Sequence, residues 1–170
     1  MISIDYKIVN NEFDDFWGEN GFLSLKFNDL KYGDIYSDEL NDLMDTVSVF
    51  NWFERLLKVY NYLYVNDQVY LSDVDSYNIW ISFKKNNSFL TVDLVSLTKD
   101  SGTKDIEFFL QSYKTVSGFS RTLKWNEFST ELLKKTGKYI DSLYKNNNDI
   151  SKFDDLVALY ETAVSYEAKF

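Results

Sequence analysis

Asp73 and Asp75 are the carboxylates whose spacing most suggests chemistry. In a strand, residues two apart point the same way, so this pair could hold a metal ion or share a proton. No third ligand lies at a diagnostic spacing, and residues 72–77 have the composition of a turn. The pattern therefore favours neither a metal site nor an acid–base pair, and it leaves the role of the two aspartates open.

The chain contains no histidine and no cysteine. These absences exclude a Ser-His-Asp or Cys-His catalytic arrangement, a zinc site of the usual ligand types and a disulfide framework. The sequence also lacks glycine-rich nucleotide-binding patterns and the GxSxG nucleophile pattern. We therefore predict a protein that is not an enzyme and has no cofactor. The remaining catalytic alternative uses only carboxylates and tyrosines that converge in one pocket.

The charge of the chain is concentrated near its N-terminus. The 170 residues carry a net charge of -9, and residues 1–48 alone have 11 acidic against 3 basic side chains, a balance of -8. Eight of these 11 acidic residues form two clusters: Glu12, Asp14, Asp15 and Glu19, and then Asp38, Glu39, Asp42 and Asp45. A field of one sign speeds association with an oppositely charged partner. The alternative interpretation is ordinary solvated loops, with negative charge near a helix N-terminus.

The same charge bears on other kinds of partner. A negative surface opposes direct binding of nucleic acid and of anionic lipid. The N-terminal segment has no basic region ahead of an apolar stretch, and no window approaches 18 consecutive apolar residues. We therefore expect a cytoplasmic protein without a membrane or nucleic-acid partner.

Periodicity predicts the secondary structure. Alternating apolar residues predict strands at the start of the chain, in a hairpin around Asn86-Asn87, and at 106–113 and 115–123. A 3.6-residue period predicts helices from a cap at Asp45 or Ser48 to about Tyr64, from Asn126, and from a capping box at Ser151 and Asp154. We predict one α+β domain, residues 1–170, with a mostly antiparallel sheet. One helix is inserted after the N-terminal strands, and two C-terminal helices pack on the sheet.

The hairpin predicts a further surface. A two-residue turn at Asn86-Asn87 places one entirely apolar face toward the core. The opposite face carries Trp80, Phe89 and Asp93, and two large aromatics there need an explanation. Either a loop or the N-terminal strands cover them, or they form a partner-binding surface.

Three segments carry a resemblance to a known group of proteins. The aromatic-rich helix Phe50–Leu57, the strand hairpin and the closing helix Trp125–Leu133, in a small acidic chain, resemble immunity proteins of bacterial polymorphic toxin systems. The likeness is one of pattern over roughly residues 20–145. It implies a non-catalytic protein that binds and occludes the effector domain of a cognate toxin. Many such toxins are basic nucleases, and others are NAD-consuming or other enzymes.

The resemblance assigns expected roles to particular residues. We expect the carboxylates of Asp38, Glu39, Asp42 and Asp45 to attract the partner electrostatically. We expect Trp80, Phe89 and Asp93 to contact it from the exposed face of the sheet. Two alternatives remain open. One is a phage-encoded acidic inhibitor or nucleic-acid mimic of a host enzyme. The other is an oligomer-forming protein in which Trp80 and Phe89 bury against a second copy.

Overall fold

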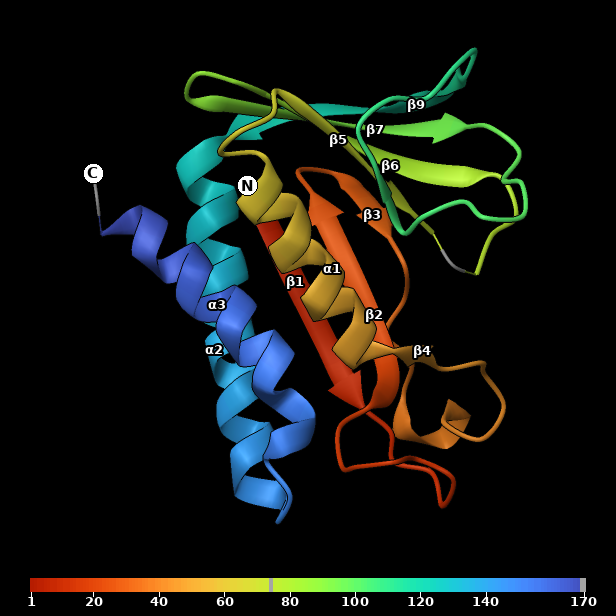
Figure 1. Ribbon diagram of the computed structural model, residues 1–170. Helices are drawn as coiled ribbons and strands as arrows, with labels where there is room; N and C mark the ends of the chain where they lie inside the picture. The colour runs from red at the N-terminus through yellow and green to blue at the C-terminus, as the bar shows by residue number, and fades with distance from the viewer. Residues whose placement is uncertain (74, 169–170) are drawn as a thin grey trace.

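A computed structural model describes residues 1–73 and 75–168 of the chain (Figure 1). Its strands are β1 (Ile2–Ile8), β2 (Asn20–Phe27), β3 (Leu30–Tyr32), β4 (Val47–Ser48), β5 (Gln68–Ser72), β6 (Ile79–Asn86), β7 (Phe89–Ser96), β8 (Ile106–Glu107) and β9 (Lys114–Lys124). Its helices are α1 (Val49–Tyr62), α2 (Trp125–Asn146) and α3 (Asp154–Glu167), with short 3-10 turns η1 (Asp38–Leu40) and η2 (Ser151–Phe153). Each described helix is too short or too polar to cross a membrane.

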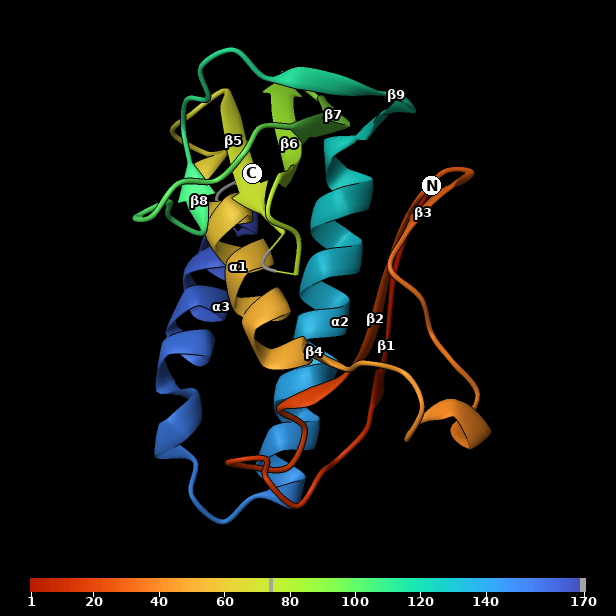
Figure 2. The ribbon, with the colours of Figure 1, turned by 90° about the vertical axis from the view of Figure 1, so that its right-hand side faces the viewer.

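The strands form two antiparallel sheets. The smaller sheet has the order β1-β2-β3, with β4 paired to β2, and the larger has the order β8-β5-β6-β7-β9. The helices α1 and α2 lie against the smaller sheet, and α3 covers them from the other side (Figure 2). The larger sheet closes one end of this assembly (Figure 1). The predicted α+β class, with the C-terminal helices packed on sheet, is confirmed.

The long helix of the first half follows its sequence pattern closely. Ser48 caps α1 by accepting a hydrogen bond from the backbone N–H of Asn51 at 3.2 Å, as predicted. In the helical period of the sequence, Arg55 lies opposite the apolar stripe, where a solvent-facing side chain is predicted, yet it is only 3% exposed. Its guanidinium donates to the carbonyl of Ser72 at 3.4 Å and lies 5.1 Å from the ring of Trp52. The prediction fails because the end of β5 packs over this side of the helix.

The hairpin of the larger sheet keeps its predicted faces but not its predicted turn. Asn86 pairs with Phe89, so the turn residues are Asn87 and Ser88 rather than Asn86 and Asn87. Asn87 has φ of 52°, the left-handed conformation that such a turn requires and that asparagine tolerates. The register moves by two residues, which preserves the alternation of inward and outward side chains. The predicted strand 115–123 lies within a continuous β9, in which Gly118 stands opposite a register shift between Asp93 and Val95.

The C-terminal helices agree with the sequence in position and differ in detail. The buried face of α2 includes Leu132, Tyr139 and Leu143, as predicted. No side chain caps α3 at its start in the described chain, so the capping box at Ser151 is wrong. Val164 is 41% exposed, and the inward side of α3 is instead formed by Leu156 and Ala163. The main core lies where these helices, the smaller sheet and the inner face of the larger sheet meet.

Candidate functional site

The four acidic residues predicted to attract a partner share one loop between β3 and β4. All four side chains are exposed: Asp38, Glu39, Asp42 and Asp45. The loop begins at Gly33, whose φ is +77° and at which a Cβ would lie 2.3 Å from the carbonyl oxygen of Leu23. Glycine is therefore required at this position, where the chain leaves β3.

Lys7 on β1 fastens this loop to the sheet. Its Nζ donates to the carbonyl of Tyr36 at 2.9 Å and to Oδ1 of Asn41 at 2.7 Å, and it lies 2.6 Å from Oδ1 of Asp38. The hydrogen bond from Lys7 lowers the pKa of Asp38. The ring of Tyr36 also packs edge-on against Phe22, with centroids 5.0 Å apart. The loop is therefore held in one conformation by contacts that leave its other carboxylates facing water.

The second acidic cluster lies in the loop between β1 and β2. Asp14 accepts from the N–H of Asn11 at 3.0 Å, and Glu19 accepts from the N–H of Asp15 at 2.8 Å. Two of the four acids thus hold the loop's own backbone, whereas Glu12 and Asp15 are exposed. The β1–β2 loop and the part of the β3–β4 loop around η1 lie at the same end of the molecule, away from the larger sheet (Figures 1 and 2). The β3–β4 loop begins at Gly33, near Asp73 and Asp75. We call residues 9–19 and 33–46 the acidic end.

Two large apolar side chains project from the acidic end. Leu43 is 75% exposed between Asp42 and Asp45, and Phe13 is 87% exposed beside Glu12. The sequence reasoning missed both residues. Both could have been predicted from the sequence, because each is a large apolar residue among acidic residues in a polar segment, where no core is expected to cover it.

Trp80 does not belong to an exposed surface, and that prediction is wrong. Its side chain is only 2% exposed, and its indole N–H donates to the carbonyl of Leu97 at 3.1 Å. It packs in a second, small core with Tyr70, Val95 and Leu110. The segment from β7 to β9 covers this face of the sheet, which is the alternative in which a loop shields the tryptophan.

Phe89 and Asp93 lie on the larger sheet, away from the acidic end (Figure 1). Asp93 is half-buried and pairs across the sheet with Ser82 and Ser120. Phe89 is 52% exposed and lines a pocket of about 770 Å³ that also contains Lys85. We call it the Lys85 pocket. The seven predicted contact residues therefore do not form one surface; only the four acids lie together.

The aspartate pair lies in a turn, as its composition indicated. Asp73 follows the end of β5, and its side chain accepts from the N–H of Asp75 at 3.0 Å; Val74 lies outside the described residues. The hydroxyl of Tyr32 donates to the carboxylate of Asp73, and Lys99 Nζ donates to its carbonyl. Burial, followed by the charge of Asp73, raises the pKa of Asp75. Within residues 1–73 and 75–168, no three His, Cys, Asp or Glu side chains are grouped so that they could hold a metal ion.

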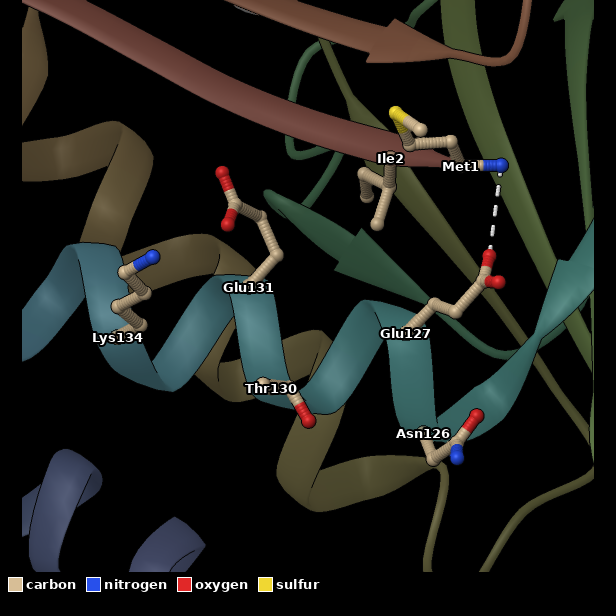
Figure 3. A pocket seen from close by; sticks show the side chains of 7 residues that line it. All are labelled: Met1, Ile2, Asn126, Glu127, Thr130, Glu131 and Lys134. Carbon is tan, nitrogen blue, oxygen red and sulfur yellow. Dashed lines mark ion pairs between the residues drawn. The ribbon is translucent and has the colours of Figure 1, made fainter.

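A shallow hollow of about 350 Å³ lies where β1 meets the first turns of α2 (Figure 3). Three of its four charged groups, the amine of Met1 and the carboxylates of Glu127 and Glu131, already have partners within the described residues; the fourth is Lys134. The amine of Met1 lies 3.4 Å from Glu127, and Glu131 accepts from the backbone N–H of Ile4 at 3.1 Å. Glu131 also lies 3.6 Å from Lys135. We assign this hollow the structural role of joining β1 to α2.

Comparison of the chain with known proteins supplies no relative. No protein-family model, no curated protein and no solved structure matches it. Function must therefore be argued from the two features that the geometry singles out, the acidic end and the Lys85 pocket.

Proposed function

We propose that the chain is a non-catalytic binding protein whose acidic end docks on a basic protein partner. In its specific form, this is an immunity protein that occludes the effector domain of a cognate bacterial toxin. The observation that carries the proposal is the placement of two anchored acidic loops at one end, each bearing an exposed apolar side chain, Leu43 or Phe13.

Each part of this surface has a physical role in binding. The exposed carboxylates of the loop raise the rate of encounter with a basic surface. Leu43 and Phe13 supply apolar area that becomes buried only when a partner covers it. Lys7 fixes the loop before binding, so less conformational entropy is lost on association. Occlusion requires no chemistry from the inhibitor, which is consistent with a chain without histidine or cysteine.

The experiment begins with co-purification of the tagged chain from its native host, or with the protein encoded immediately upstream, followed by mass spectrometry. We expect a stoichiometric partner with a basic surface. A toxin domain supports the immunity form, whereas a host enzyme of nucleic-acid metabolism supports the inhibitor or mimic form. Recovery of the chain as a partner-free monomer from both preparations would contradict the proposal.

Association kinetics then test the site itself. The triple variant Glu39→Lys, Asp42→Lys, Asp45→Lys reverses exposed charges but leaves the Lys7–Asp38 contact intact. We expect slower association at low ionic strength, by an amount that shrinks as salt is added. The control is Glu161→Lys, on an exposed part of α3. Equal association rates for the triple variant and the unmodified chain at low salt would refute a role for the acidic end.

A further inference from the structure

The Lys85 pocket lies at the end of the molecule opposite the acidic end. It is lined by the β6–β7 turn, the start of α2, Tyr64 after α1 and Glu167 at the end of α3. In Figure 1 these segments meet where the upper end of α2 approaches the larger sheet. Its volume of about 770 Å³ falls within the range of about 300–1,000 Å³ that is usual for small-molecule sites.

Stacked aromatic rings form its rigid wall. Trp125 stacks on Tyr60 with ring centroids 5.1 Å apart, and Tyr64 stacks on Tyr166 at 4.2 Å. The hydroxyls of Tyr60 and Tyr64 both bind Oε1 of Glu167, at 2.5 and 3.2 Å. These contacts hold the carboxylate of Glu167 against the wall.

Lys85 places a positive charge on this wall. Its Nζ lies 4.3 Å from the ring centre of Trp125 and 4.5 Å from that of Tyr64, within the range of a cation–π contact. The one hydrogen bond of its side-chain ammonium within the described chain is a long one, 3.4 Å, to the carbonyl of Leu63. No carboxylate of the described residues lies within ion-pair distance of it, and burial lowers its pKa. An ammonium group has three donors, so Lys85 retains capacity for an anion.

Two further features point to the same ligand chemistry. Lys124 also lines the pocket and immediately precedes α2, whose first turn has no side-chain cap within the described chain. The N-terminus of a helix favours negative charge. Phe89 is 52% exposed at the same pocket, and no ring contact within the described residues covers it. The pocket thus combines two cations, Lys85 and Lys124, and one carboxylate, Glu167, with an open aromatic ring; the carboxylate of Glu167 is already bound by two tyrosine hydroxyls.

We propose that the Lys85 pocket binds a small organic anion that carries a planar ring. The anionic group lies at Lys85, and the ring reaches around the end of the hairpin to Phe89. Lys124 pairs with Phe89 on the face opposite Lys85, so it adds positive charge on the ring side of the pocket. This site is separate from the acidic end and does not depend on the function proposed above.

The test is titration of the full chain, at low ionic strength, with phenyl phosphate, benzoate and adenosine monophosphate. Binding is followed by calorimetry and by the amide and indole signals in nuclear magnetic resonance spectra. We expect at least one probe to bind saturably and to shift the indole signal of Trp125. Inorganic phosphate and adenosine, which carry only one of the two required groups, are expected to bind more weakly than adenosine monophosphate.

Variants of single lysines test whether the probes bind at the Lys85 pocket. Lys85→Met keeps the aliphatic stem and removes the charge, and we expect it to weaken binding about tenfold or more. Lys114→Met removes an exposed lysine of β9 and is expected to leave affinity unchanged. If Lys85→Met does not fold, Lys124→Met, at an exposed position, tests the same charge requirement. Absence of saturable binding by every ring-bearing probe, or equal effects of the pocket variant and Lys114→Met, would overturn the proposal.

Discussion

The hydroxyl of Tyr139 joins α2 to the acidic end, and its removal gives a sharp test of the packing described above. The hydroxyl donates to the carbonyl of Gly18 at 2.7 Å, and the tyrosine side chain is fully buried. Its ring stacks on Phe53 with centroids 4.8 Å apart. The substitution Tyr139→Phe keeps this stacking and deletes only the hydrogen bond.

The expected loss of stability follows from the buried carbonyl that loses its hydrogen-bond donor. The carbonyl of Gly18 stays in a buried position without its donor, and a buried polar group that loses its partner costs about 1–3 kcal/mol. With a urea dependence of about 2 kcal/mol/M, the unfolding midpoint should fall by about 0.5–1.5 M. This is a substantial part of a total stability of about 5–15 kcal/mol.

Urea unfolding followed by circular dichroism measures the change. Tyr77→Phe is the matched control, since it deletes the same atom at a side chain that is 76% exposed, and it should change stability by less than about 0.5 kcal/mol. Amide hydrogen exchange in residues 9–19 should also accelerate in Tyr139→Phe. Equal unfolding midpoints for Tyr139→Phe and the unmodified chain, with equal slopes, would refute the reasoning.

Three other outcomes follow from contacts elsewhere in the chain. Ser48→Ala removes the N-cap of α1 and should destabilise the fold by about 1 kcal/mol in urea unfolding. Trp80→Ala should cost about 3–5 kcal/mol, whereas Phe89→Ala should cost less than about 0.5 kcal/mol; equal costs would contradict the burial described for Trp80. Hydrogen bonds from Arg121 at 2.7 and 2.9 Å lower the pKa of Asp29 from 3.8 to about 2. Because this pKa is depressed in the folded chain, the contribution of the pair is present above pH 3.8 and is lost as pH falls through about 2. A carboxyl-carbon titration should give that midpoint for Asp29, moving toward 3.8 in Arg121→Met.

The elements that the sequence predicted well are those with strong local signals. The start of α1 can be predicted to within a few residues because Asp45 and Ser48 precede an apolar stripe of helical period; the structure selects Ser48 as the cap and confirms the stripe. The inward and outward faces of the β6–β7 hairpin can be predicted from the sequence, but the two residues of its turn cannot. A slip of two residues leaves every side chain on the same face, so periodicity alone does not distinguish Asn86-Asn87 from Asn87-Ser88.

The features that the sequence did not predict depend on contacts between distant segments. Arg55 is buried because the end of β5 reaches it, and Trp80 is buried because the segment around Leu97 and Leu110 covers it. The division into two sheets likewise depends on pairings such as β7 with β9, which no local pattern specifies. Within the candidate site, counting charges was sufficient to find the acidic loops. The Lys85 pocket required four separate parts of the chain to be brought together.

The placement of the acidic end and the Lys85 pocket at opposite ends makes the molecule an electric dipole (Figures 1 and 2). Residues 1–48 carry a balance of -8, whereas the rest of the chain is nearly neutral at -1. In the field of a basic surface, a torque turns the negative pole forward before contact. In the proposed docking mode, the molecule would arrive with the Lys85 pocket on the side away from the partner. The two proposed sites would then not compete, and each could bind its ligand while the other is occupied.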